Sequence, residues 1–280
     1  MTNNSHRPTI DLYTLFNKAF EHFNAQLFSN ELPSVIITLQ RQSNMMGYFS
    51  KNRWSNKAGN KIHEIAVNPS YFAGHKLIEI FQTVVHEQAH LWQEEFGTPS
   101  RAAYHNTEWA NKMESIGLMP SNTGRPGGRR TGQRMSDYPI IGGQFMAASK
   151  ALMEDGFNLE WIDRYPAYIP SEQAIKNLNS DISTHHLDDT TAIESALEDA
   201  LMDMVDEDIH VDVDDKINEQ LNTLVVDIIP DIVSPHSDEA REAKKNNKTK
   251  YQCECKNNVW GKPNLNIRCE VCDTLFLIIE

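Results

Sequence analysis

Residues 76–96 read KLIEIFQTVVHEQAHLWQEEF, and this stretch decides the fold. Gly97 and Pro99 follow it, and both residue types end helices. The apolar residues recur at helical spacing and fall largely on one side of the predicted helix: Leu77, Ile80, Phe81, Val84, Val85, Ala89 and Trp92. We therefore expect one long helix whose apolar side faces a core.

The same helix carries HEQAH at residues 86–90, which fits the pattern His-Glu-x-x-His. Because positions i and i+4 share one face of a helix, His86 and His90 can both ligate one tetrahedral zinc ion. Glu87 would lie beside the water on the metal and take its proton as a carbonyl is attacked. The alternative is that these are ordinary polar residues of the helix. Burying them in so apolar a helix would be costly without a purpose, so the pattern favours a zinc metallopeptidase with Glu87 as its catalytic base.

Such a site needs a third protein ligand from outside the pentapeptide. Glu94 and Glu95 are too close along the same helix to complete the set. His105 opens the next predicted helix after a turn and can swing back toward the metal. Glu108 is a rival, because one class of zinc peptidases uses a glutamate from a later helix. We favour His105, and Glu108 stays open.

The remaining pattern predicts a mixed α+β domain. Helices are expected at residues 10–29, 108–116 and 144–153, and strands at 35–39, 45–50 and 62–68, with Lys51–Lys61 as a turn or loop.

A family resemblance rests on five pieces of sequence: LFSNELP (27–33), GYFS (47–50), HEIAVNPSYF (63–72), HEQAH and HNTEW (105–109). The segment from Leu12 to about Ile116 resembles the SprT-like metallopeptidases, the group that includes Spartan. The resemblance implies a minimal zincin-like metallopeptidase core of helices packed on a small sheet, with His105 as the third zinc ligand. It also implies protein substrates that are bound to or trapped on DNA. The family often has Gly-His-Gly where this chain has Tyr104, His105 and Asn106.

All four cysteines lie near the C-terminus, and their spacing predicts a structural zinc ribbon. Four thiolates leave no open position on a zinc ion, so this second ion would stabilise the fold. The alternative is four reduced cysteines without a metal. Tyr251 and Trp260 lie nearby and could offer stacking surfaces to nucleic acid. The alternative, which stays open, is a small core aromatic beside solvated lysines. The predicted ligands are Cys253, Cys255, Cys269 and Cys272.

Charge is distributed unevenly along the chain. The net charge is −13, yet residues 1–150 carry a net +4 and residues 181–239 a net −17. Within the basic part, the loop 121–134 alternates glycines with four arginines, a composition suited to gripping a phosphate backbone. The alternative is a solvated basic loop. The predicted nucleic-acid-binding residues are Arg125, Arg129, Arg130 and Arg134.

The sequence thus predicts three parts. Residues 1–170 form the metallopeptidase domain, 171–250 an acidic then basic linker that is partly helical or disordered, and 251–280 the ribbon. Within the linker, helical patches are expected at Ala196–Met204 and Leu221–Ile229. The sequence shows no signal peptide and no membrane span, so we expect a cytoplasmic protein, associated with the nucleoid in a bacterium, with a nuclear location left open.

The predicted function is a zinc endopeptidase acting on or near DNA, on DNA-bound or DNA-crosslinked proteins. Two alternatives stay open: a DNA- or protein-binding adaptor with vestigial peptidase activity, and a regulatory protease that cuts one partner without DNA. The sequence does not indicate an oligomeric state.

Overall fold

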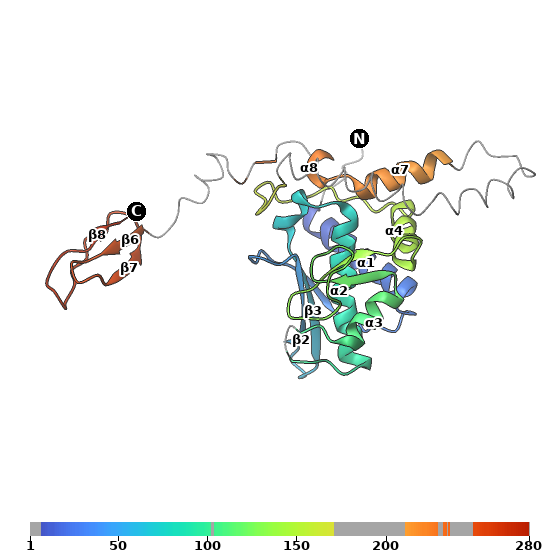
Figure 1. Ribbon diagram of the computed structural model, residues 1–280, viewed down its shortest axis with the longest axis horizontal. Helices are drawn as coiled ribbons and strands as arrows, with labels where there is room; N and C mark the ends of the chain where they lie inside the picture. Colours follow the sequence, from blue (N-terminus) through green and yellow to red (C-terminus); the bar gives the residue numbers. More distant parts are fainter. Residues whose placement is uncertain are drawn as a thin grey trace, which may run out of the picture. The chain divides into compact units, whose positions relative to one another are not determined.

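A computed structural model describes residues 7–101, 104–170, 211–228, 232, 233, 235 and 249–279. The chain divides into two units, Met1–Ile232 and Val233–Glu280. The first unit contains, in chain order, α1 (Pro8–Leu27), β1 (Ile36–Leu39), β2 (Gly47–Ser55), β3 (Lys61–Val67), the short 3₁₀ helix η1 (Pro69–Gly74), α2 (Leu77–Phe96), α3 (Thr107–Ser115), β4 (Leu118–Ser121), β5 (Ser136–Pro139), α4 (Gln144–Glu154), α7 (Val211–Asn222) and α8 (Val225–Ile228) (Figure 1). This mixture of helices and small sheets confirms the predicted α+β class.

Helix α2 is the centre of the first unit, with the sheet on one side and α1 and α3 on the other (Figure 1). Its start is fixed by Glu79, whose Oε2 accepts a hydrogen bond from the Lys76 backbone N–H at 2.7 Å. It ends before Gly97. Its apolar face is buried with that of α1, as the periodicity predicted, and the shared core includes Phe16, Phe23, Ile80, Phe81, Val84 and Val85.

The main sheet has the order β1-β3-β2, with β1 parallel and β2 antiparallel to β3. Strand β2 is therefore an edge strand, and it packs along α2. The predicted turn Lys51–Lys61 is wrong at both ends, because β2 continues to Ser55 and β3 starts at Lys61. A bulge between Ser50 and Trp54 allows this continuation, since it absorbs extra residues in the longer strand.

A second, two-stranded sheet pairs β4 with β5 in antiparallel register. The hairpin connection between them is the glycine- and arginine-rich loop. Sequence periodicity did not reveal either strand, because each has only four residues. The hairpin contacts α2 through β5 and α3 through β4.

Helix α7 belongs to the first unit although it falls in the segment expected to be a linker. It packs against α2 and α4, and α8 packs against η1. The side chains of Ile217, Leu221 and Val225 are buried in the main core. The expected helical patch Leu221–Ile229 is thus divided between α7 and α8, whereas the patch Ala196–Met204 lies outside the described residues.

The second unit contains β6 (Thr249–Gln252), β7 (Asn258–Gly261) and β8 (Leu277–Ile278) in a three-stranded antiparallel sheet of order β7-β6-β8. Its small core is built from Tyr251, Cys253, Cys269 and Phe276. Across the described part of the chain, no helix has the length and apolar character needed to cross a membrane.

Candidate metal centre

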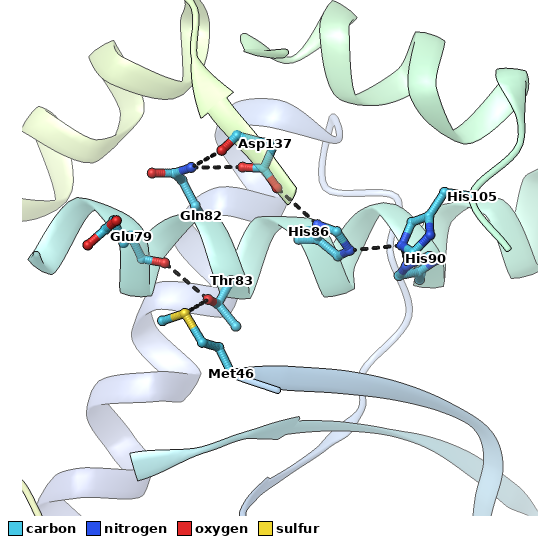
Figure 2. Close-up of polar contacts among 8 residues, drawn as sticks. All are labelled: Met46, Glu79, Gln82, Thr83, His86, His90, His105 and Asp137. Atoms are coloured by element: carbon cyan, nitrogen blue, oxygen red, sulfur yellow. Dashed lines mark hydrogen bonds and ion pairs between the residues drawn. The ribbon is translucent and has the colours of Figure 1, made fainter. Parts of the chain in front are cut away.

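Three histidine side chains converge on one point. His86 and His90 project from consecutive turns of α2, and His105 precedes α3. The Nε2 atom of His105 lies 3.2 Å from that of His86 and 3.1 Å from that of His90 (Figure 2). A tetrahedral zinc ion with Zn–N distances of about 2.0–2.1 Å separates its ligand nitrogens by about 3.3 Å. The three rings therefore fit a single zinc ion.

The rival ligands are engaged elsewhere. The Oε2 atom of Glu108 accepts hydrogen bonds from Gln93 Nε2 and from the Thr98 backbone N–H, both at 2.7 Å. Glu94 pairs with Lys51 and Glu95 with His63. The structure thus brings His105, and not one of the three glutamates, to His86 and His90.

The segment around His105 is held by Asn106, the residue at which the family often has glycine. The Asn106 side chain caps α3 by accepting a hydrogen bond from the Trp109 backbone N–H at 3.0 Å. Its Oδ1 also accepts from Gln93 Nε2 on α2 at 2.7 Å. The second bond ties the start of α3, next to His105, to α2.

Burial favours the neutral, metal-binding form of two of the three imidazoles. Burial, together with the neighbouring His86, lowers the pKa of His105 to about 4 and that of His90 well below its usual range. Burial also opposes charge on His86, but the hydrogen bond with Asp137 and the charges of Glu87 and Asp137 outweigh it and raise the His86 pKa.

Glu87 is buried, with only 6% of its surface exposed. Burial raises the pKa of its carboxyl to about 7, while the nearby His86 and a hydrogen bond with the Phe49 backbone act in the opposite direction. Phe49 belongs to β2, so the edge strand passes directly beside this carboxyl. A carboxyl that titrates near neutral pH can both take and return a proton under physiological conditions.

Two residues that sequence reasoning gave no role complete the centre. Trp109 is fully buried in α3, and the centroid of its ring lies 4.4 Å from that of His105, 4.8 Å from His86 and 5.4 Å from His90. Asp137 on β5 places its Oδ2 2.9 Å from His86 Nδ1 (Figure 2). Trp109 already stood in the quoted motif HNTEW, and Asp137 is the only acidic residue between positions 115 and 153. Those were the available signals.

Comparison with known proteins agrees with this arrangement. A model of the SprT-like family matches residues 16–126. The chain belongs to the SprT-like family. A relative in Salmonella typhimurium, an uncharacterized protein in the mucB 3′ region, is 42% identical over 59 residues, which are 21% of this chain and 80% of that protein. No solved structure matches the chain.

The SprT-like match spans the three histidines and Glu87, and it ends before the second half of the β4–β5 hairpin. Asp137 and most of the arginine-bearing loop therefore lie beyond the part that the family describes. In this loop Ser121 Oγ donates to the Arg125 carbonyl at 2.6 Å, and the Arg129 backbone N–H donates to Asn122 Oδ1 at 2.7 Å. The loop is thus an ordered turn.

The four arginines predicted to bind nucleic acid are all exposed on this loop. One of them, Arg130, pairs with Glu114 and donates to Asn111 Oδ1 at 3.1 Å, both on α3. Arg130 therefore anchors the loop to α3 as well as adding positive charge. The binding of nucleic acid by these residues remains a prediction.

The four cysteines of the second unit also converge. Their Sγ atoms all lie within 4.8 Å of one another, and no disulfide joins them. Cys255 Sγ is 3.7 Å from Cys269 Sγ, close to the separation of about 3.8 Å that Zn–S distances of about 2.3 Å give in a tetrahedral site. Each pair is followed by a residue in the left-handed region, Lys256 after the first and Asp273 after the second. The short Cys-x-Cys spacing is accommodated by this turn.

Of the two uses left open for the aromatics of this unit, the small-core alternative holds for Tyr251. Tyr251 is 1% exposed, and its hydroxyl donates to the Lys262 carbonyl at 2.6 Å, so it serves the small core and cannot stack on a base. Trp260 is 60% exposed, with Lys250 Nζ 5.9 Å from its ring centroid.

Proposed function

We propose that the chain is a zinc-dependent endopeptidase of the HExxH type, with His86, His90 and His105 as zinc ligands and Glu87 as the catalytic base. The observation that carries the proposal is the convergence of three Nε2 atoms beside a buried carboxyl from the same helix. Family membership supports the same chemistry. A second zinc ion on the four cysteines has a structural role in this proposal, because thiolates fill all four positions.

When bound, zinc supplies Lewis acidity toward a peptide carbonyl and toward the proton of a water molecule. Glu87 accepts that proton and later delivers it to the leaving amine. The carboxyl is buried on the helix that carries two of the three ligands, so a proton it accepts is kept from bulk solvent between the two steps. Trp109 and Asp137 keep the imidazoles in place, so they contribute through the ligands.

The free edge of β2 suits an extended peptide. Within the described residues β2 pairs only with β3, and its Phe49 backbone bonds to the Glu87 carboxyl, so the outer edge of β2 runs directly past the metal centre. A substrate segment that adds to this edge as a further strand would bring its backbone to the metal centre. Backbone pairing is largely independent of side chains, so we propose that unfolded or extended protein segments of varied sequence are the substrates.

We further propose that this peptidase acts on or near DNA, on DNA-bound or DNA-crosslinked proteins. Support comes from the four exposed arginines on the β4–β5 loop. The same loop pairs with the backbone of His105 through Gly132, so a phosphate chain held there would lie close to the metal centre.

Two comparisons test these proposals. Zinc-loaded wild type should cleave casein, and Glu87→Gln with equal metal content should not; equal rates in both proteins would defeat the peptidase mechanism.

Oligonucleotides should bind wild type in a salt-sensitive way and stimulate its cleavage, and Arg129→Gln/Arg134→Gln should weaken both effects. The matched control is Lys57→Gln/Lys61→Gln, which removes the same charge from exposed positions in the β2–β3 turn and at the start of β3. If cleavage is strong but indifferent to DNA, the regulatory-protease alternative replaces the DNA-directed one.

A further inference from the structure

The β4–β5 hairpin touches two of the three candidate zinc ligands. Asp137 on β5 places Oδ2 2.9 Å from His86 Nδ1. Gly132, in the connecting loop, exchanges two backbone hydrogen bonds with His105, at 2.9 and 3.1 Å. The Gly132 carbonyl oxygen is also 3.2 Å from His105 Nδ1. One hairpin therefore contacts the Nδ1 side of both rings, opposite the Nε2 atoms that converge.

Asp137 is held rigidly in this position. It is 7% exposed, and Gln82, one turn before His86 on α2, donates from Nε2 to both its Oδ1 at 2.9 Å and its backbone carbonyl at 3.0 Å (Figure 2). The other carboxylate oxygen is left for His86. Because one oxygen of the Asp137 carboxylate is held by Gln82, the other oxygen can accept the Nδ1–H of His86 while the Asp137 side chain keeps its rotamer.

These contacts set the tautomer of each ring. If His86 donates Nδ1–H to Asp137 and His105 donates Nδ1–H to the Gly132 carbonyl, both Nε2 atoms keep a lone pair for the metal. Removing such an outer partner from a zinc-binding histidine typically costs 10- to 100-fold in metal affinity. The third ring, His90, is stacked on Trp109 at an interplanar angle of 22°.

We propose that the β4–β5 hairpin supports the metal site from outside the ligands, with Asp137 as the positioning residue of His86. The hairpin also links the two events, so that zinc binding makes the arginine-bearing loop more ordered. The inference rests on the zinc site of the proposed function. The coupling follows because both contacts come from one hairpin, so fixing the rings by a metal also fixes the loop between them. Linkage is reciprocal, so an anion that orders the loop would tighten zinc binding by the same factor.

The first test measures metal release from the full-length protein. Cobalt(II) is the probe, because cobalt on thiolates has strong near-ultraviolet charge-transfer absorption that a three-histidine site lacks, and the two sites can be followed separately. With excess chelator, Asp137→Ala should release cobalt from the histidine site 10- to 100-fold faster than wild type. Asp137→Asn, which keeps an acceptor oxygen, should fall between them.

The matched control is Asp163→Ala. The Asp163 side chain is as buried as that of Asp137, 8% against 5% exposed, but it pairs with Arg41, away from the histidines. It should release metal at the wild-type rate whatever its thermal stability. If it releases metal as fast as Asp137→Ala, the effect is general destabilisation and the positioning role of Asp137 is overturned.

The second test reads the loop directly. Trypsin cuts after Arg129, Arg130 and Arg134, all exposed. In the Glu87→Gln background, which prevents self-cleavage, zinc should slow cutting at these arginines several-fold and leave cutting at Lys57 in the β2–β3 turn nearly unchanged. Adding Asp137→Ala should abolish this protection. Loop cleavage that ignores zinc would overturn the coupling.

Two variants distinguish a failure of the three-histidine zinc site from a failure of the role given to the hairpin. If His105→Ala binds as much metal as wild type, the zinc site itself is wrong. If His105→Ala loses the histidine-site metal while Asp137→Ala releases it at the wild-type rate, the zinc site stands and the role of the hairpin is refuted.

Discussion

Ionisation of Glu87 should lower the free energy of unfolding of the metal-free protein. Burial raises the pKa of this carboxyl from 4.5 to about 7. Between those values the folded protein holds a proton that the unfolded chain has released, so the free energy of unfolding decreases as pH rises through this window and levels off above it. A pKa difference of this size corresponds to about 3 kcal/mol.

Glu87→Gln removes the ionisation while keeping the shape of the side chain. The metal-free variant should therefore be more stable than metal-free wild type at pH 8, by about 3 kcal/mol, and of similar stability at pH 5. Urea unfolding followed by circular dichroism, with chelator present, measures both values. A residue that costs this much stability when charged is expected at a functional site and not at a structural one.

Glu94→Gln is the matched control, four residues from His90 on the same helix. Its carboxylate pairs with Lys51, so neutralising it should bring no gain at either pH. The reasoning about Glu87 is refuted if Glu87→Gln is less stable than wild type at pH 8, or if the difference between the two proteins does not change with pH.

Three further predictions concern Trp109 beside the three histidines, helix α7 and the second unit. Trp109→Ala should lose about 3–5 kcal/mol of stability and also the metal of the histidine site. Met113→Ala, which is equally buried on the same helix, should lose about 2–5 kcal/mol of stability and keep that metal. Equal metal loss in both variants would contradict the role of Trp109 in supporting the histidines. Leu221→Ala should lower the free energy of unfolding by about 3 kcal/mol in urea titrations and the exposed Glu219→Ala by less than about 0.5, and equal effects would show that α7 does not contribute to the core. Cys269→Ser should lose one zinc ion by elemental analysis and the folded structure of the second unit by NMR, while casein cleavage by the first unit persists.

Local patterns predicted most of the helices and the metal-ligand motif. The helix around HEQAH is specified by its own periodicity, and the i, i+4 spacing of His86 and His90 then fixes their shared face. His105 was favoured over Glu108 on its place in the chain, and the structure brings it to the other two. Such features depend on residues a few positions apart, so a single sequence can reveal them.

Features made by distant residues were not predictable in the same way. Asp137 reaches His86 only because 118–121 pairs with 136–139, and both strands are too short to show a period. Helix α7 follows a long acidic segment, and the helical patch expected from Leu221 gave no sign that it would pack into the core of the first unit. The sequence left Tyr251 open between base stacking and a small core, because nothing local in the sequence distinguishes the two uses; the structure places it in the core.

Zinc content, measured by elemental analysis on purified full-length proteins, tests the central claim most directly. Among the residues that the structure describes, two groups can hold a metal ion, so wild type should bind two zinc ions. His105→Ala should bind one, and Glu108→Ala, which removes the rival ligand, should still bind two. Two zinc ions in His105→Ala, or one in Glu108→Ala, would contradict the proposed three-histidine centre.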